Sequence, residues 1–181
     1  MIKKSTSKSK GSEFERIIAK RLTLWISGQS KEYWFWRTPS SGAMGTLGNS
    51  VVASGDIISI KQEGEWFLNR YSIEVKNGYP NSSFHKHLKG VKNDEIRIFW
   101  EQCVRDATRA DKLPLLIYKK KHYNALIGVS DFDEVINLKL RNIPSITMKW
   151  CDNDTLPICH FFDIEEYLNN VTPEDMKNVS L

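Results

Sequence analysis

Residues 70–78 read RYSIEVKNG, and the stretch has the alternation of a β-strand with one apolar face. In an extended chain, Ile73 and Val75 point to one side, whereas Glu74 and Lys76 point to the other. Two interpretations are open. Either the charged face is simply solvated, or a carboxylate and an ammonium group are held side by side to act on an anionic partner.

The composition limits the class of protein. The chain has 181 residues, of which 40% are apolar, which is enough for one domain with its own core. A formal charge of +4 suits a polyanionic partner without requiring one. The three scattered cysteines favour a reducing compartment over a disulfide framework, and neither a secretory signal nor an apolar run of ~20 residues is present. We therefore expect a soluble, cytoplasmic protein with no membrane partner.

The spacing of apolar residues predicts the order of helices and strands. Residues 1–10 are rich in Lys and Ser and are expected to form a disordered basic arm. A helix is predicted over 13–27, with Ser12 as its N-cap and Glu15 as a capping-box partner. The other expected elements are strands over 33–39, 55–61, 70–76, 113–119, 125–129 and near 145–150, and helices over 95–110 (capped by Asp94) and near 163–170.

This order predicts an α/β fold with a central mixed sheet flanked by helices, in the order helix, three strands, helix, strand. We expect one domain over 11–181, with a core over 11–130 and a C-terminal extension over 131–181. The polar segment 62–66 is expected to close a hairpin between strands 55–61 and 70–76. Such a hairpin would bring Asp56 close to Glu74.

Two adjacent carboxylates raise each other's pKa unless a cation lies between them. Oxygen ligands suit Mg²⁺, and Lys76 on the same face would support an attacking water or the charge that develops on a phosphate. Asp56, Glu74 and Lys76 therefore predict metal-dependent phosphodiester hydrolysis. The triplet alone is weak evidence, because Asp175-Met176-Lys177 repeats it without a strand pattern or a partner acid.

The stretches KGSEFER (10–16), RTPSSG (37–42), GDI (55–57), IEVKN (73–77) and EQ (101–102) resemble the PD-(D/E)XK nuclease superfamily. Within it, the chain is most similar to archaeal-type Holliday junction resolvases and their viral relatives. The resemblance implies a restriction-endonuclease-like core and a viral or mobile-element origin. Residues 130–181 match no family pattern, and Gly55 stands where the superfamily motif has proline.

The implied activity is that of a Mg²⁺-dependent endonuclease in DNA recombination and repair, with Mn²⁺ able to substitute. It would act as a homodimer on four-way DNA junctions. Two alternatives stay open: another nuclease of this fold that is restriction-like or cuts flaps or duplex, and a non-catalytic DNA-binding module.

The resemblance also implies roles for individual residues. Asp56, Glu74 and the Val75 carbonyl would bind the metal, with Glu15 as an accessory acid at the same site. Lys76 would orient or activate water, and Gln102 would reach the site from the second helix. The DNA-binding candidates are Arg37, Ser41, Lys10, Lys86 and Lys89, with Ser41 also near the scissile phosphate. Two weaker metal candidates are His85-x-His87, which better fits a solvated or DNA-facing segment, and the set Cys151, Cys159 and His160.

Overall fold

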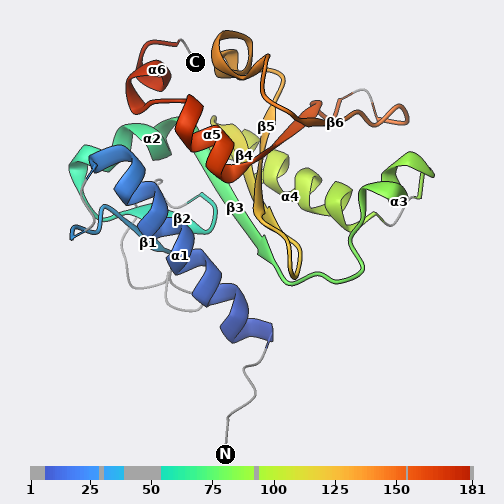
Figure 1. The fold of residues 1–181 in the computed structure, drawn as a ribbon, viewed down its shortest axis with the longest axis horizontal. Helices are drawn as coiled ribbons and strands as arrows, with labels where there is room; N and C mark the ends of the chain where they lie inside the picture. Colours follow the sequence, from blue (N-terminus) through green and yellow to red (C-terminus); the bar gives the residue numbers. More distant parts are fainter. Residues whose placement is uncertain (1–6, 29–30, 39–53, 92–93, 154, 180–181) are drawn as a thin grey trace, which may run out of the picture.

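The computed structural model describes residues 7–28, 31–38, 54–91, 94–153 and 155–179 (Figure 1). The helices are α1 Ser7–Ser27, α2 Glu65–Arg70, α3 Phe84–Leu88, α4 Glu95–Arg109, α5 Ile164–Asn170 and α6 Pro173–Lys177. The strands are β1 Phe35–Arg37, β2 Ile57–Ser59, β3 Tyr71–Asn77, β4 Leu113–Lys119, β5 Ala125–Ser130, β6 Ile146–Met148 and β7 Cys159–Asp163, and there is a 3₁₀ turn at Gln62–Gly64 and a π-helical segment at Ile136–Leu140. Over the ranges given above, no helix has the length and apolar character of a membrane span.

The strands form two sheets. The larger sheet has five strands in the order β3-β4-β5-β7-β6, in which β3 and β4 run parallel and the other neighbours run antiparallel. A small antiparallel sheet of β1 and β2 lies beside the edge strand β3 and is joined to it by a parallel bridge between Gly55 and Ile73. The predicted α/β fold with a mixed central sheet is confirmed.

Helices cover both faces of the large sheet, with α1 and α5 on one face and α4 on the other (Figure 1). Because side chains alternate along a strand, Ile73 and Val75 enter the core beneath α1, whereas Leu116 and Tyr118 enter the core beneath α4. Glu74 and Lys76 therefore lie on the α4 face. This arrangement sets which helix can contact the candidate site.

The helix α4 matches its prediction closely. The Asp94 carboxylate caps it by accepting a hydrogen bond from the Ile96 amide at 3.1 Å. The predicted apolar stripe is buried against the sheet and consists of Ile96, Phe99, Trp100, Cys103 and Ala107. A cap followed by a regular apolar period was sufficient to locate this helix.

The beginning of α1 differs from the prediction. The helix begins at Ser7, so residues 7–10 are helical instead of part of a disordered arm, and Ser12 lies inside the helix instead of capping it. Lys and Ser are compatible with a helix, and a capping-box match marks a helix start only when the preceding residues do not continue the helix. Residues 1–6 lie outside the described ranges.

The predicted hairpin between 55–61 and 70–76 is wrong. The strand β2 ends at Ser59, and the helix α2 carries the chain across so that residues 55–56 run parallel to β3. The helix α2 forms because its Phe67 is buried among aromatic rings and contacts Trp25, Phe35 and Tyr71. Tertiary packing outweighed the polar, glycine-containing sequence that had suggested a turn.

The C-terminal residues are part of the sheet. The strand β7, which we had not predicted, lies between β5 and β6, and its Cys159 and Phe161 are buried. The following segment contacts α1, because the Trp25 indole donates hydrogen bonds of 3.0 Å to the carbonyls of both Leu168 and Val171. Residues 131–179 therefore complete the domain instead of extending from it.

A buried polar network fixes this part of the chain to β3. The Arg70 guanidinium lies 3.2 Å from the Asp133 carboxylate, and the Tyr71 hydroxyl donates to the same carboxylate at 2.7 Å. Arg70 also donates to the Val179 carbonyl at 3.1 Å. Since these side chains are almost fully buried, each depends on the others for its hydrogen bonds.

We expect Asp133→Asn to lower the free energy of unfolding by about 3–5 kcal/mol, because it leaves the buried Arg70 charge without its counterion. Urea denaturation measures the change. The control is Lys139→Ala, which breaks an exposed ion pair with Asp175 and should cost less than about 1 kcal/mol. Equal losses in the two variants would contradict a special role for the buried pair.

Candidate nuclease site at the edge strand

Asp56 is held against β3 by hydrogen bonds to backbone groups on both of its sides. The Asp56 amide donates to the Ile73 carbonyl at 2.7 Å, and the Asp56 side chain accepts from the Val75 amide at 2.8 Å. On the other side, the Thr38 amide donates to the Asp56 carbonyl at 2.8 Å. Asp56 therefore lies beside Glu74 in a parallel arrangement, instead of across the hairpin that the sequence suggested.

Gly55 makes this close approach possible. Its φ is +91°, and a Cβ atom built on it would lie 2.4 Å from the Ile73 carbonyl oxygen. Proline cannot adopt a positive φ, so the residue expected from the superfamily motif would not fit this backbone. The departure from the motif is thus a requirement of the local geometry.

Glu74, Lys76 and Gln102 form a closed set of contacts on the α4 face. The Lys76 ammonium pairs with the Glu74 carboxylate and donates to the Gln102 side-chain oxygen at 3.1 Å. The Gln102 amide group in turn donates to Glu74 at 2.9 Å. Lys76 also lies 5.5 Å from the centre of the Phe99 ring. The charged face of β3 is therefore covered by α4, and the interpretation as a solvated surface is wrong.

Burial and neighbouring charge shift the pKa values of this set. Burial, followed by the charge of Asp56, raises the pKa of Glu74 from 4.5 to about 7. Burial also raises the pKa of Asp56, although the Val75 amide and Lys76 oppose the shift. Burial would lower the pKa of Lys76, but the hydrogen bond and charge of Glu74, with the charge of Asp56, leave it above its usual value. The site thus holds a cationic lysine beside two acids that resist ionising together.

Glu15 and Arg37 reach the same edge from α1 and β1. Their side chains lie 3.4 Å apart and both are mostly buried. Burial and the negative charge of Asp56 raise the pKa of Glu15, while Arg37 lowers it. Because Asp56 influences Glu15 in this way, the structure brings both predicted residues to the neighbourhood of the acid pair.

Other predicted residues lie elsewhere. Lys86 is on α3 and Lys89 is its C-cap, with no contact to the acid pair, while Lys10 lies within α1. Ser41 is outside the described residues. His85 and His87 face different surroundings, since His87 packs against Trp150 with ring centres 5.5 Å apart and His85 borders a separate pocket.

One charged residue near the site was missed. The negative charge of Asp106 adds to the upward shifts of the pKa values of both Asp56 and Glu74. Asp106 lies one helical turn after Gln102 on α4, so its i+4 spacing was a usable signal. Arg105 and Arg109 both lie within 3.6 Å of its carboxylate. Charged residues so closely spaced are typical of a solvated helix surface, so the sequence pattern did not single out Asp106.

The donor set fits a hard divalent cation. Mg²⁺ usually binds one or two protein carboxylates and completes its shell with water and phosphate oxygens. Asp56 and Glu74 supply two carboxylates whose mutual repulsion a cation would relieve. The Val75 amide faces Asp56, and the carbonyl of a strand residue points to the same side as its amide, so this third oxygen also faces that edge.

Three acids do not converge into a metal-binding cluster. Among the residues that the structure describes, no group of three or more His, Cys, Asp and Glu side chains could hold a metal ion. Glu15 is bound to Arg37 instead, and its accessory role at a metal stays a prediction. The set Cys151, Cys159 and His160 does not form such a group among the described residues either.

A mixed sheet with helices on both faces, with Asp56, Glu74 and Lys76 at its edge strand, defines a restriction-endonuclease-like fold of the PD-(D/E)XK class. The chain belongs to the protein family described as "Phage putative PDDEXK endonuclease", whose model matches residues 6–178. It is also 31% identical over 101 residues to Protein D14 of Escherichia phage T5, covering 56% of this chain and 59% of that protein. The matched region thus spans about three fifths of the curated relative's length. No solved structure matches significantly.

The raised pKa of Glu74 predicts a pH-dependent stability of the metal-free protein. A carboxyl with a pKa of 4.5 in the unfolded chain and about 7 in the fold binds more protons when folded, so its stabilising contribution is lost as pH rises from 4.5 through 7. In EDTA, Glu74→Gln should therefore gain about 1–3 kcal/mol relative to the unsubstituted protein between pH 4.5 and pH 8.

Urea denaturation at both pH values measures this difference. Adding Mg²⁺ at pH 8 should raise the melting temperature of the unsubstituted protein more than that of Glu74→Gln, because the cation needs both carboxylates. If the two proteins instead differ in free energy of unfolding by the same amount at all pH values, with or without Mg²⁺, that result would contradict the role of Glu74 as a buried acid that binds a divalent cation.

Proposed function

We propose that this protein is a Mg²⁺-dependent endonuclease that hydrolyses phosphodiester bonds in DNA, with four-way junctions as its substrate. The observation that carries the proposal is the pairing of a buried acid and a half-buried acid, Glu74 and Asp56, with the cationic Lys76 at the edge of the sheet. Membership of the phage endonuclease family supports the same reaction class.

Each residue of the candidate site has a distinct task in this proposal. Asp56, Glu74 and the Val75 carbonyl hold the cation, which supplies positive charge at the phosphate and acidifies water when it is bound. Gln102 keeps Glu74 and Lys76 in place through its two hydrogen bonds. Arg37, fixed by Glu15, is suited to bind a phosphate oxygen of the substrate.

Lys76 acts as a cation in this proposal. Its raised pKa keeps the ammonium protonated at neutral pH, which does not suit a general base. A fixed ammonium group can orient the attacking water through its N–H bonds and can stabilise the negative charge that develops on the phosphate. Loss of the charge should therefore affect the rate more than the fold.

A junction substrate requires two symmetric cuts, and a two-fold dimer supplies two sites in the necessary arrangement. The helix α1 offers a surface for a second copy, because Ile17 and Leu24 lie two turns apart and are 55% and 47% exposed. A flap- or duplex-cutting nuclease would use the same site residues. The two alternatives differ in the substrate cut and in the pairing of the cuts.

We expect the protein to nick a labelled four-way junction at paired, symmetric positions with Mg²⁺ or Mn²⁺, and not in EDTA. Asp56→Asn should lower the rate by orders of magnitude and leave junction binding intact, because it removes a ligand charge with little change in volume. Denaturing gels and gel-shift assays measure the two properties. Equal cutting of linear duplex would contradict the junction preference, and cutting by Asp56→Asn at a normal rate would contradict the site.

Lys76→Met should remove most activity while the melting temperature stays close to that of the unsubstituted protein. The control within the same chain is Lys177→Met, in the second Asp-x-Lys triplet on α6, where Lys177 lies 5.0 Å from the Trp66 ring and contacts none of the site residues. This control should cleave at the normal rate. Similar losses of cleavage activity in the two variants would contradict a specific role for Lys76.

A further inference from the structure

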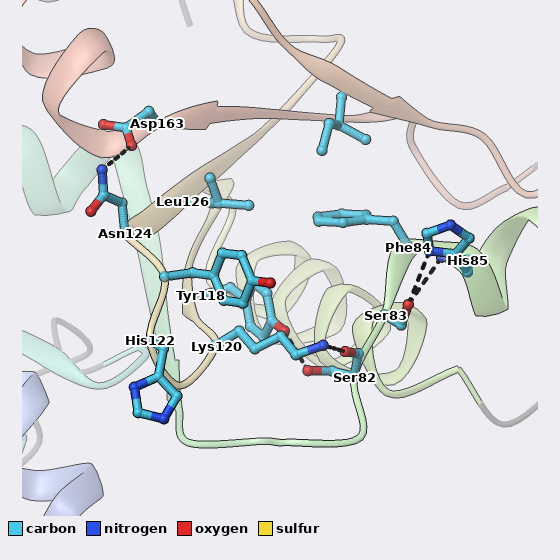
Figure 2. Close-up of a pocket in the computed structure, with 12 residues that line it drawn as sticks. Ser82, Ser83, Phe84, His85, Tyr118, Lys120, His122, Asn124, Leu126 and Asp163 are labelled. Carbon is cyan, nitrogen blue, oxygen red and sulfur yellow. Dashed lines mark hydrogen bonds between the residues drawn. The ribbon is translucent and has the colours of Figure 1, made fainter.

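A pocket lies on the same face of the sheet as Lys76. It has a volume of about 650 Å³ and lies between α3, the turn that joins β4 and β5, and the strand surface (Figure 2). The residues on which the argument rests are Phe84, Tyr118, Lys120, His122, Tyr123 and Leu126.

Strand register relates the pocket to the candidate nuclease site. Lys76 of β3 is paired with Tyr118 of β4, which is paired with Leu126 of β5, and paired residues share a face of the sheet. Neighbouring strands are about 4.8 Å apart, so the floor of the pocket begins one strand from Lys76 and reaches about 10 Å across the sheet. Buried aromatic side chains fill the interval, because Phe99 of α4 packs against Lys76 and lies 6.3 Å from the Tyr118 ring.

The lining combines aromatic rings with basic groups. Tyr123 is 67% exposed and Phe84 is half-buried, whereas Tyr118 is almost fully buried and forms part of the floor. Lys120, His85 and His122 also line the pocket (Figure 2). Among the described residues of the lining, Asp163 carries the one carboxylate. This carboxylate already accepts hydrogen bonds from the Asn124 side chain at 3.0 Å and the Glu165 amide at 2.8 Å. Rings for stacking beside cations for phosphate are the features that bind single-stranded nucleic acid.

The walls of the pocket are held in place by internal contacts. The Tyr118 hydroxyl is hydrogen-bonded to the Ser82 hydroxyl, and the Lys120 ammonium donates to the Ser82 carbonyl at 2.8 Å (Figure 2). The turn is closed by the Tyr123 amide, which donates to the Lys120 carbonyl at 3.1 Å. Within this turn, His122 has a φ of 69°, a conformation that favours glycine. The turn thus keeps an imidazole at the opening where a glycine would be less strained.

We infer that this pocket takes an unpaired base of the DNA strand that is cut at Lys76. The inference rests on the proposed function for the identity of the cut strand. The strand spacing places the floor of the pocket about 10 Å from Lys76, which is within a few nucleotides of the scissile phosphate. Substrates that are frayed or branched next to the cut supply such a base, whereas continuous duplex would have to unstack one.

The test begins with binding alone, in EDTA, using a fluorescein-labelled single-stranded thymidine 12-mer. Tyr123→Ala should weaken binding about 5- to 100-fold, because one base loses its stacking partner. Tyr123→Phe keeps the ring and should bind normally. The matched control is Phe132→Ala, since Phe132 is 69% exposed but does not line this pocket. Fluorescence anisotropy measures the affinities, and circular dichroism checks that all variants are folded.

The second measurement locates the base. A four-way junction is prepared with 2-aminopurine at each of the first five positions on either side of the scissile bond and is bound in EDTA. Fluorescence should change most at one or two adjacent positions on one side, and Tyr123→Ala should abolish that change. A change that is uniform along the strand, or one that persists in Tyr123→Ala, would overturn the placement.

The two proposals fail in different ways. If Tyr123→Ala and Phe132→Ala bind the 12-mer equally well, or the unsubstituted protein does not bind it, the pocket inference is overturned even when the junction is cut normally. If Tyr123→Ala alone loses binding but no DNA is cut with any divalent metal, the binding of an unpaired base in the pocket stands and the proposed nuclease activity fails.

Discussion

The backbone contact between residues 55–56 and the edge strand β3 is the constraint on which the candidate site depends. Gly55 lies against Ile73 so closely that a side chain would collide with its carbonyl, and this approach lets the Asp56 carboxylate accept from the Val75 amide. The small sheet of β1 and β2 brings Asp56 and Arg37, whereas the large sheet brings Glu74 and Lys76. The two halves of the site meet at this contact, so the geometry of the acid pair follows from the lack of a Cβ atom at one position.

The electrostatics of the site follow from that geometry. Burial and the proximity of two carboxylates raise their pKa values, and the charge of Asp106 on α4 adds to the effect. One lysine cannot balance this charge, and it is already shared between Glu74 and Gln102. A site with surplus buried negative charge is costly when it is empty and is relieved by a divalent cation. The same surplus would repel the scissile phosphate without a cation, which ties the cleavage step to the metal in the proposed reaction.

Sequence patterns correctly predicted the helices and strands that are specified by their own residues. The helix α4 has a capping aspartate and a continuous apolar stripe, and β3 and β4 have unbroken strand patterns, so all three were predicted within about a residue. The path between β2 and β3 was mispredicted because α2 is stabilised by the aromatic rings around Phe67, which come from distant parts of the chain. The acid pair was nevertheless anticipated, because either connection places residue 56 at the edge of β3. The register across β3, β4 and β5 that aligns the pocket with Lys76 has no signature in any one segment.

The residues that follow the predicted core are built into the large sheet, and this bears on both sites. Without β7, the strand β5 would be an exposed edge, and its Gly128 packs directly beneath Phe161, where a Cβ atom would lie 2.7 Å from the ring. Without Asp133, the buried Arg70 at the start of β3 would lack its counterion. The residues after 130 therefore fix both margins of the sheet surface that carries Lys76, Tyr118 and Leu126. This dependence explains in physical terms why the family match extends through residue 178, well beyond the motif residues.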